Sequence, residues 1–433
     1  LYYWSSNKCW WWNGNGLKGG FTLKRRVVVT GLGAVTPIGN DVESFWSGIK
    51  SAKNGIDEIT LFNHENLKVK MAGEVKNFDP TLYMDKKESK RMDRYTQFTI
   101  AAATEALNDS KINLDEANRE KIGVFFGSGI GGLSTLESQI RTLVVKGPSR
   151  VSPLTIPMSI SNIASGTIAI KFGLLGSSFS ITSACASATH CIGEAYRNIK
   201  DGYCDVIFAG GAEASICEFG ISSFQSLTAL SKSEDRNRAS IPFDLERNGF
   251  VMGEGAGVLI LEELESALKR GAHIYCEIVG YGSTCDAYHI TSPCPDGDGA
   301  YRAMRDAMLD ADVEPSKISY INAHGTATEI NDKVETLAIK KAFGDNYMKP
   351  YVSSTKSMTG HLLGAAGAIE AIASIKAVED NFVPPTINYV HPDPDCDINL
   401  IVNEGKESNI EYSMSNSLGF GGHNATLIFK KWR

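Results

Sequence analysis

The sequence predicts an α/β protein made of two similar halves, each a β-sheet with helices on both faces. Buried β-branched runs that end in glycine alternate with alanine-rich helical stretches, a pattern typical of βαβ units. Residues 277–282 repeat the apolar-then-glycine pattern of residues 28–33, which indicates that the unit occurs twice. The chain has 433 residues and 42% hydrophobic content, enough for a large core and more than one domain.

We expect the first half to span residues 25–275 and the second half residues 276–433. Residues 1–24 differ from the rest of the chain because tryptophans crowd there among Asn, Gly and Lys. We interpret this extension as the remnant of a tag or presequence, with a hydrophobic docking segment as the alternative. The tryptophans concerned are Trp4, Trp10, Trp11 and Trp12.

Composition and charge exclude several classes of function. The formal net charge of −7 argues against a nucleic-acid-binding role. No run of 18 apolar residues occurs, so no membrane span is expected. The 9 cysteines include no CxxC pair, which argues against a disulfide framework or a structural zinc site and favours a reducing compartment. We therefore expect no structural metal.

The first half is predicted to begin with a buried strand over residues 25–33, which ends in a tight turn at Gly31 and Gly33. A helix is expected over residues 97–109. Further strands are expected at 121–127, before a glycine-rich loop at 128–132, at 179–182, before a helix of small residues, and at 205–211.

The second half repeats this order. Strands are expected at 277–282, 318–324 and 351–355, and a Gly/Ala-rich helix is expected over 364–377. Because strands alternate with helices in both halves, we expect parallel sheets that are covered on both faces.

Cys185 is the candidate nucleophile. It lies in the run SACASA (183–188), where a short strand leads into the first turn of a small-residue helix. The partial positive charge of a helix N-terminus favours thiolate over thiol, and the free N–H groups of the first turn can bind an oxyanion. The alternative is an ordinary buried cysteine in a tightly packed helix.

Two histidines stand at comparable strand-to-loop junctions. His324 lies in NAHGTAT (322–328), where a buried strand reaches a polar loop, and strand ends of this kind are the usual place for chemistry. His361 lies in STKSMTGHLLGAAG (354–367), five residues after Lys356 and nine before Glu370. Glu370 can pair with Lys356. The alternatives are a loop-capping histidine for His324 and a surface salt bridge for the Lys–Glu pair.

The last chemical signal is the run SLGFGGHN (417–424). Phe420 is flanked by glycines, which suits an aromatic side chain that gates a pocket or a backbone N–H that is donated to a ligand. The alternative is a plain hairpin turn.

Together these segments resemble those of β-ketoacyl-acyl carrier protein synthases of the KAS I/II type, over about residues 25–433 and in the same order. The resemblance implies a thiolase-like fold, in which two similar βαβαβαββ halves form a five-layered αβαβα sandwich. The Cys-His-His set differs from the Cys-His-Asn set of initiating condensing enzymes and from thiolases, which use a second cysteine.

The resemblance also implies residue roles. Cys185 accepts the acyl group, His324 and His361 assist decarboxylation of a malonyl thioester, and Lys356 with Glu370 supports the histidines. The other implied residues are the gating Phe420, whose N–H joins that of Cys185 in an oxyanion hole; the supporting Asp332 and Glu335; and the substrate-binding Ile130, Phe224, Thr291, Thr326, Thr328, Gly419 and Gly421.

Three positions depart from the family pattern. Glu329 follows Thr328 where proline is common, and His423 stands where threonine is usual. Thr228 stands where some members have an arginine that contacts the carrier, so the resemblance does not carry over the detail of carrier docking.

The implied activity is that of a 3-oxoacyl-[acyl-carrier-protein] synthase. Acyl and malonyl thioesters on a carrier condense through an acyl-Cys185 intermediate with loss of CO2, and no metal or redox cofactor is needed. The implied partners are an acyl carrier protein and a second copy of the chain. A basic cluster is the candidate docking patch for an acidic carrier, with a solvated helix face as the alternative. It comprises Lys86, Lys87, Lys90, Arg91, Arg94 and Arg150.

Three alternative functions are weighed against this one. A stand-alone polyketide ketosynthase shares these motifs. A thiolase is disfavoured because the last glycine-rich loop has no cysteine, and a chain-length partner subunit is disfavoured because such subunits usually lack the nucleophile that Cys185 supplies. The expected compartment is a plastid-type organelle or a bacterial cytoplasm.

Overall fold

The computed structural model describes residues 4–5, 8–9 and 25–433. Within these ranges, ten strands form one continuous sheet made of two five-stranded sheets. The two join where β3 (Val27–Val35) pairs with β10 (Cys276–Cys285) over the first three residues of each strand. The predicted extension 1–24 lies mostly outside the described residues, and the predicted boundary at 275/276 stays a prediction.

The two sheets have the same topology. The first has the order β7 (Ser178–Phe179), β6 (Ile122–Gly127), β8 (Val206–Glu213), β9 (Gly255–Glu263), β3. The second has the order β12 (Tyr351–Ser353), β11 (Ile318–Asn322), β15 (Tyr412–Gly419), β16 (His423–Lys431), β10. Every pair has the same direction in both halves, which confirms the two similar βαβαβαββ halves.

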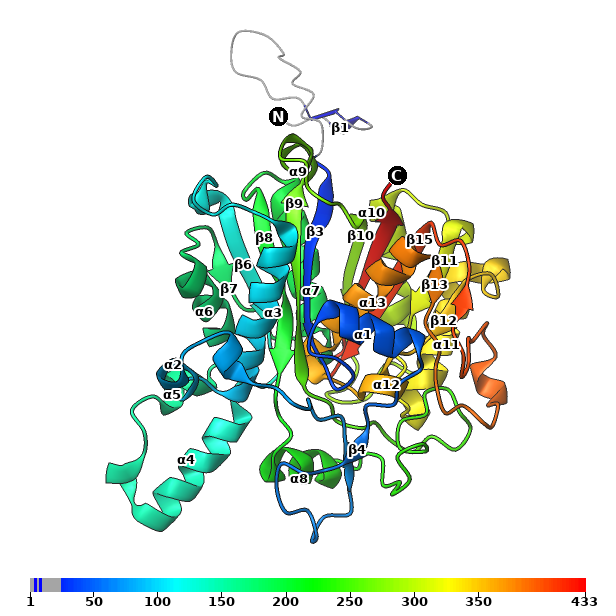
Figure 1. Ribbon diagram of the computed structural model, residues 1–433. Coiled ribbons are helices and arrows are strands. Elements are labelled where there is room, and N and C mark those ends of the chain that lie inside the picture. The colour runs from blue at the N-terminus through cyan, green and yellow to red at the C-terminus, as the bar shows by residue number, and fades with distance from the viewer. Residues whose placement is uncertain (1–3, 6–7, 10–24) are drawn as a thin grey trace.

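Helices complete five layers (Figure 1). α3 (Arg94–Ser110) and α6 (Ile163–Phe172) cover the outer face of the first sheet. α7 (Ser187–Lys200) and α13 (Ala366–Asp380) pack against each other between the sheets, and α10 (Asp298–Ala311) and α11 (Glu329–Phe343) cover the second sheet. This arrangement confirms the predicted αβαβα sandwich.

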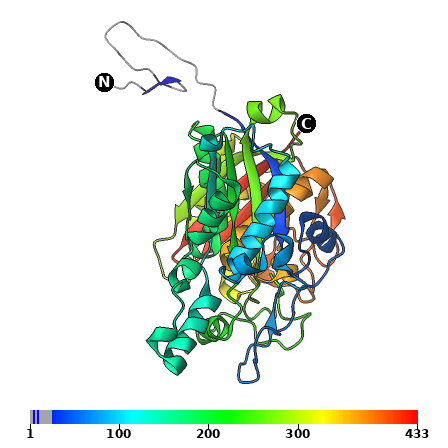
Figure 2. The ribbon, with the colours of Figure 1, turned by 60° about the vertical axis from the view of Figure 1, so that its left-hand side comes forward.

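The remaining helices and short strands lie in the segments outside these five layers. They are α1 (Val42–Lys50), α2 (Lys86–Ser89), α4 (Leu133–Lys146), α5 (Thr155–Ser159), α8 (Glu218–Ser226), α9 (Leu264–Lys269), α12 (Lys356–Thr359), β1 (Trp4–Ser5), β2 (Lys8–Cys9), β4 (Asp57–Glu58), β5 (Met71–Ala72), β13 (Phe382–Val383) and β14 (Lys406–Glu407). Figure 2 shows α4 projecting from the body of the protein. Among the described residues, no helix has both the length and the apolar character needed to cross a bilayer.

The prediction of parallel sheets holds only in part, because both sheets are mixed. In the first half only β6, β7 and β8 run parallel to one another, and in the second half only β11, β12 and β15 do. In the second half, residues 420–422 connect β15 directly to β16, and so short a connection forces an antiparallel pair. In each half the strand that opens the half then pairs antiparallel with the strand that closes it.

The prediction of a turn at Gly31 and Gly33 was wrong, since both glycines lie inside β3. A Cβ on Gly33 would lie 1.9 Å from the carbonyl oxygen of Ala102 in α3, so the glycine lets the helix approach the strand. Gly282 in β10 has the same relation to Ala303 of α10, at 2.0 Å. The repeated glycine pattern therefore reflects helix–strand packing in both halves.

Candidate active site

Two short turns precede the central helices and face each other at the seam of the halves. One is the 3-10 turn Ala184–Ala186 before α7, and the other is Leu363–Ala365 before α13. Ala184 and Leu363 both have positive φ, at 51° and 48°. We call these turns the first and second elbow.

Gly364 occupies in the second elbow the position that Cys185 occupies in the first. A Cβ at Gly364 would lie 2.1 Å from the backbone nitrogen of Gly129, so this position has no room for a side chain. The two elbows are thus alike in backbone, but only the first one carries a reactive group.

The structure brings Cys185, His324 and His361 together at this seam. The Sγ atom of Cys185 and one ring nitrogen of each histidine all lie within 4.8 Å of one another, and all three residues are buried. The two imidazole rings meet edge to face with centroids 5.2 Å apart. The cluster confirms the Cys-His-His set, with the sulfur supplied by one half and the imidazoles by the other.

His324 is held from two sides. Glu335 in α11 accepts the backbone N–H groups of His324 and Gly325, each at 2.8 Å. Lys356 Nζ donates to the carbonyl oxygen of His324 at 2.6 Å and lies 3.4 Å from its Nδ1. Because an ammonium group can only donate, this contact favours the tautomer with the proton on Nε2.

Burial keeps both imidazoles neutral. It lowers the pKa of His324 well below its ordinary value, and Lys356 and His361 lower it further. Burial and Lys356 likewise hold the pKa of His361 well below the ordinary range. Neither ring nitrogen of His361 has a hydrogen-bond partner among the described residues, so both can interact with a substrate.

Lys356 and Glu370 form a buried ion pair beside the histidines. Burial raises the pKa of Glu370, and the ammonium of Lys356 partly offsets this effect. The predicted alternative of a surface salt bridge was wrong, because the side chains are only 2% and 3% exposed.

We expected the helix N-terminus to lower the pKa of Cys185 and so favour the thiolate, but burial of the sulfur has the opposite effect. Burial raises the pKa of the Cys185 thiol to about 12, while Lys356 and the backbone N–H of Phe420 pull it downward. The resting residue is therefore a thiol, and it must lose its proton as it attacks. A neutral imidazole within 4.8 Å is available to accept that proton.

The backbone of Phe420 reaches the nucleophile because Gly419 has no side chain. A Cβ on Gly419 would lie 2.6 Å from the carbonyl oxygen of Ser183 and 3.3 Å from the N–H nitrogen of Cys185. The N–H of Phe420 interacts with the sulfur of Cys185. Two N–H groups, those of Cys185 and Phe420, are thus available beside the sulfur for an oxyanion.

A cavity of about 770 Å³ opens onto the three reactive side chains. It is lined by most of the predicted substrate-binding residues, whereas Gly421 lies outside the lining and donates its N–H to Ile290 at 2.8 Å. The predicted residues in the lining are Ile130, Phe224, Thr291, Thr326, Thr328 and Gly419.

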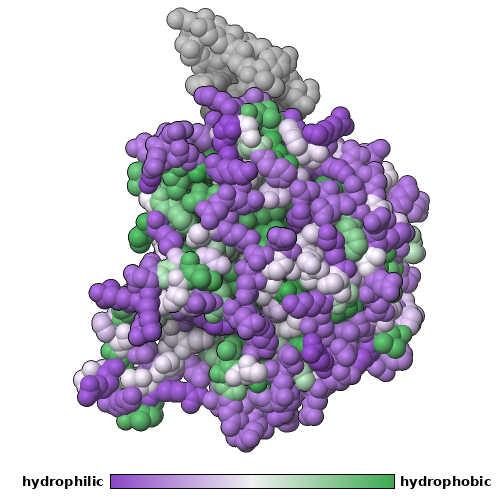
Figure 3. Space-filling view, viewed as in Figure 1, coloured by the Kyte–Doolittle hydropathy of each residue, from purple (hydrophilic) through white to green (hydrophobic). Residues whose placement is uncertain are grey.

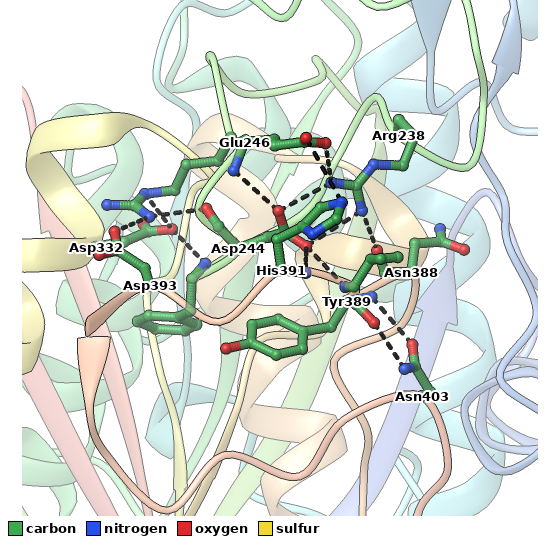
Figure 4. A network of polar contacts seen from close by, with 12 residues as sticks. Arg238, Asp244, Glu246, Asp332, Asn388, Tyr389, His391, Asp393 and Asn403 are labelled. Carbon is green, nitrogen blue, oxygen red and sulfur yellow. Dashed lines mark hydrogen bonds and ion pairs between the residues drawn. The ribbon is translucent and has the colours of Figure 1, made fainter. Parts of the chain in front are cut away.

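Asp332 supports the wall of this cavity and does not reach the reactive groups. It accepts the N–H of Phe243 at 2.8 Å and lies 3.6 Å from Arg247, which lines the cavity. Figure 4 shows the polar network in which Asp332 and Asp393 meet the loop that carries Asp244. The network fixes the segment 238–250 against α11 and the loop 388–393.

Sequence reasoning missed Glu213, Arg247 and Phe250. Glu213 at the end of β8 accepts the N–H of Gly129 at 2.7 Å and that of Gly364 at 3.1 Å, so it joins the two halves beside the nucleophile. Arg247 and Phe250 line the cavity, and Phe250 lies edge to face with His361 at 5.3 Å. Their partners lie far away in the sequence, so no local pattern marks them.

The predicted docking residues lie at the surface, with one exception. Arg94 donates two hydrogen bonds to the buried Glu254, at 2.9 and 2.7 Å, and is already paired there. The residues that remain exposed are Lys86, Lys87, Lys90, Arg91 and Arg150.

A thiolase-like sandwich with a cysteine and two neutral imidazoles at the seam of its halves defines a condensing acyltransferase. Residues 24–267 match the family described as beta-ketoacyl synthase, N-terminal domain, and residues 275–390 match its C-terminal domain. The chain belongs to the beta-ketoacyl synthase family.

Curated relatives cover almost the whole chain. The 3-oxoacyl-[acyl-carrier-protein] synthase 2 of Synechocystis sp. is 52% identical over 411 residues, which are 95% of this chain and 99% of the relative. The protein of the same name from Staphylococcus aureus is 51% identical over 408 residues, 94% of this chain and 99% of the relative.

Solved structures agree with the fold. A beta-ketoacyl synthase from Burkholderia phymatum superposes with a TM-score of 0.88 at 34% identity and covers 94% of this chain and 100% of its own. The ishigamide ketosynthase/chain length factor has a TM-score of 0.90 at 36% identity and covers 95% of this chain and 100% of its own. A type II polyketide ketosynthase in complex with its acyl-carrier protein has a TM-score of 0.88 at 36% identity and covers 94% of this chain and 100% of its own.

Proposed function

We propose that this chain is a 3-oxoacyl-[acyl-carrier-protein] synthase, which extends an acyl group held on Cys185 by two carbons taken from malonyl carrier. The observation that carries the proposal is the meeting of Cys185, His324 and His361 within 4.8 Å at the end of one large cavity. The high identity to two proteins named for this activity supports it.

Loading transfers the acyl group from the carrier thioester to Cys185. The sulfur attacks the carbonyl carbon, and the oxyanion accepts hydrogen bonds from the N–H groups of Cys185 and Phe420, which typically contribute about 3–4 kcal/mol each. The thiol proton moves to the neutral His361 and then to the departing carrier sulfur. Loading therefore changes no net charge and leaves a free carrier thiol.

Condensation begins when malonyl carrier enters the acylated site. Its carboxylate leaves as CO2, and the electrons of the broken bond form an enolate, whose oxygen accepts N–H bonds from His324 and His361. The enolate carbon attacks the acyl carbonyl on Cys185, and a 3-oxoacyl carrier forms. The released thiolate takes one proton from solvent, because its pKa lies far above neutral pH.

Mass spectrometry tests the proposal directly. Incubation with acyl carrier should add one acyl group to Cys185, and malonyl carrier should then remove it with release of CO2 and a product two carbons longer. The Cys185→Ala variant is the control and should stay unmodified. An acyl group on another residue, or full elongation by the variant, would exclude the mechanism.

A polyketide ketosynthase is the second candidate, since structural neighbours include ketosynthases of that type. The same assay separates the two functions. A fatty acid synthase component should accept saturated acyl carriers and stop after one condensation per loading, whereas a polyketide ketosynthase should extend an unreduced 3-oxoacyl chain.

We propose an acidic acyl carrier protein as the partner, docking on the exposed basic residues of α2 and its flanks. Lys87→Glu with Arg91→Glu should raise KM for acyl carrier and leave KM for an acyl pantetheine unchanged. Lys269→Glu with Lys317→Glu, two exposed reversals elsewhere on the surface, is the matched control. Equal loss for both substrates would contradict docking at this patch.

We also propose a homodimer that forms at the open edge of the first sheet. β7 is an edge strand with Phe179 43% exposed, and an unprotected edge readily pairs with another strand. Nearby α6 and the loop after it expose Ile170 and Leu175 at 81% and 69%, and Figure 3 shows hydrophobic surface on this side. Phe179→Lys should yield a monomer in sedimentation; an unchanged dimer would place the interface elsewhere.

We also propose that the reaction requires no metal and no free cofactor. Activity should survive dialysis against a chelator, although the Cys-His-His cluster has the geometry to hold a soft cation. The compartment, a plastid-type organelle or a bacterial cytoplasm, stays a prediction.

A further inference from the structure

His190 in α7 is a buried histidine that takes no part in the reaction described above. Its Nδ1 lies 2.7 Å from Ser183 Oγ, at the start of the first elbow. Its Nε2 lies 3.1 Å from Ser283 Oγ in β10. The ring thus joins the elbow that carries Cys185 to a strand of the other half.

Ser183 anchors the elbow through all its polar groups. Its N–H donates to Ser187 Oγ at 2.9 Å, and its carbonyl oxygen accepts the N–H of Ala186 at 3.1 Å. The next residue, Ala184, has a φ of 51°, a conformation that persists only where neighbouring groups hold it. A shift of Ser183 would therefore move the nucleophile.

The two hydroxyl partners of His190 differ in their access to water. Ser183 is buried, so its hydroxyl depends on the imidazole, whereas Ser283 is exposed and can bond water instead. Burial lowers the pKa of His190 to about 4, with a smaller contribution from His423. A neutral ring has one donor and one acceptor nitrogen, which suits two hydroxyl groups.

We propose that His190 is a positioning residue for acyl loading, which holds Ser183 and so keeps the sulfur and the N–H of Cys185 aligned. Acyl loading depends on the contact between His190 and Ser183, and it does not depend on the contact between His190 and Ser283. This inference rests on the proposed function, because loading is the step it concerns.

Two substitutions separate the two contacts. In His190→Asn the side-chain amide can take the place of Nδ1 and keep the bond to Ser183, whereas in His190→Gln it can take the place of Nε2 and keep only the bond to Ser283. Ser183→Ala and Ser283→Ala remove the same contacts from the other side.

The measurements are the single-turnover rate of Cys185 acylation from acyl carrier, the rate of CO2 release after malonyl carrier is added to enzyme that is already fully acylated, and the thermal midpoint. His190→Asn and Ser283→Ala should load within about threefold of wild type. His190→Gln and Ser183→Ala should load at least about tenfold more slowly, because small displacements of a reacting atom are costly, with CO2 release nearly unchanged.

Equal loading by the Asn and Gln variants would overturn the inference. So would a parallel fall in loading and CO2 release, which would mean that His190 only stabilises the fold. If either variant failed to fold, Ser183→Ala against Ser283→Ala decides the same question. A wild-type protein that neither loads nor releases CO2 would instead overturn the proposed function.

Discussion

Removal of the buried charge of Lys356 tests what that side chain does. Lys356→Met keeps the length of the side chain and leaves the carboxyl of Glu370 buried without its partner. Oε2 of Glu370 already has no hydrogen-bond partner among the described residues. The carboxyl will therefore take up a proton in the folded variant, because a neutral group is less costly to bury.

The cost of that proton fixes the expected magnitude. The ordinary pKa of the carboxyl is 4.5, and each pH unit above it costs about 1.36 kcal/mol. The variant should thus be less stable than wild type by at most about 3.4 kcal/mol at pH 7, because burial already raises the pKa of Glu370 in the wild type; broken buried pairs typically cost about 3–5 kcal/mol.

The sign of the pH dependence follows from the raised pKa. A carboxyl that is neutral in the folded variant contributes full stability below pH 4.5 and loses it as pH rises. The deficit should therefore shrink to at most about 1.4 kcal/mol at pH 5.5. Urea unfolding of variant and wild type at both pH values measures it, and a deficit equal at both would refute the reasoning.

A double variant separates stability from chemistry. Lys356→Met with Glu370→Leu removes both charges and should recover most of the stability, since apolar replacement of a buried pair is often neutral. His324 would still lack the donor at Nδ1, so CO2 release should stay about 10²-fold below wild type, as for a lost donor in a reactive site. Full recovery of activity would show that Lys356 only stabilises the fold.

Three further predictions follow from distances and burial. Alkylation of Cys185 by iodoacetamide should accelerate about tenfold per pH unit between pH 7 and 9 without a plateau, because the pKa of the thiol is raised to about 12; a plateau near pH 7 would contradict this. Gly419→Ala should lower kcat/KM at least about tenfold, since the new Cβ would lie 2.6 Å from the carbonyl of Ser183; a wild-type value would place Phe420 elsewhere. Gly33→Ala should reduce the free energy of unfolding by about 1–3 kcal/mol through its clash with Ala102 and leave kcat unchanged; an unchanged urea midpoint would contradict the packing.

The reactive residues could be predicted because each carries a local signal. Cys185 and His324 follow short segments with strand character and are flanked by small residues, and His361 precedes a Gly/Ala run. Such signals lie within a few residues of the reactive group, so they are visible without knowledge of packing.

What could not be predicted depends on contacts between distant segments. The glycines of β3 look like turn residues until α3 is placed against them, some 70 residues away. The pKa of Cys185 depends on how deeply the fold buries the sulfur, which no neighbouring residue reveals. Glu213 is marked by no motif, because its partners come from two other loops.

The paired elbows have a consequence for how such an enzyme can be altered. Each half supplies an elbow of similar backbone conformation. The first elbow carries the sulfur of Cys185, whereas the second has Gly364, because the main chain of Gly129 occupies the space that a side chain would need. A second thiol therefore cannot be installed by symmetry. The first half supplies Cys185 and the second half supplies both histidines, so neither half should be able to carry out the chemistry by itself.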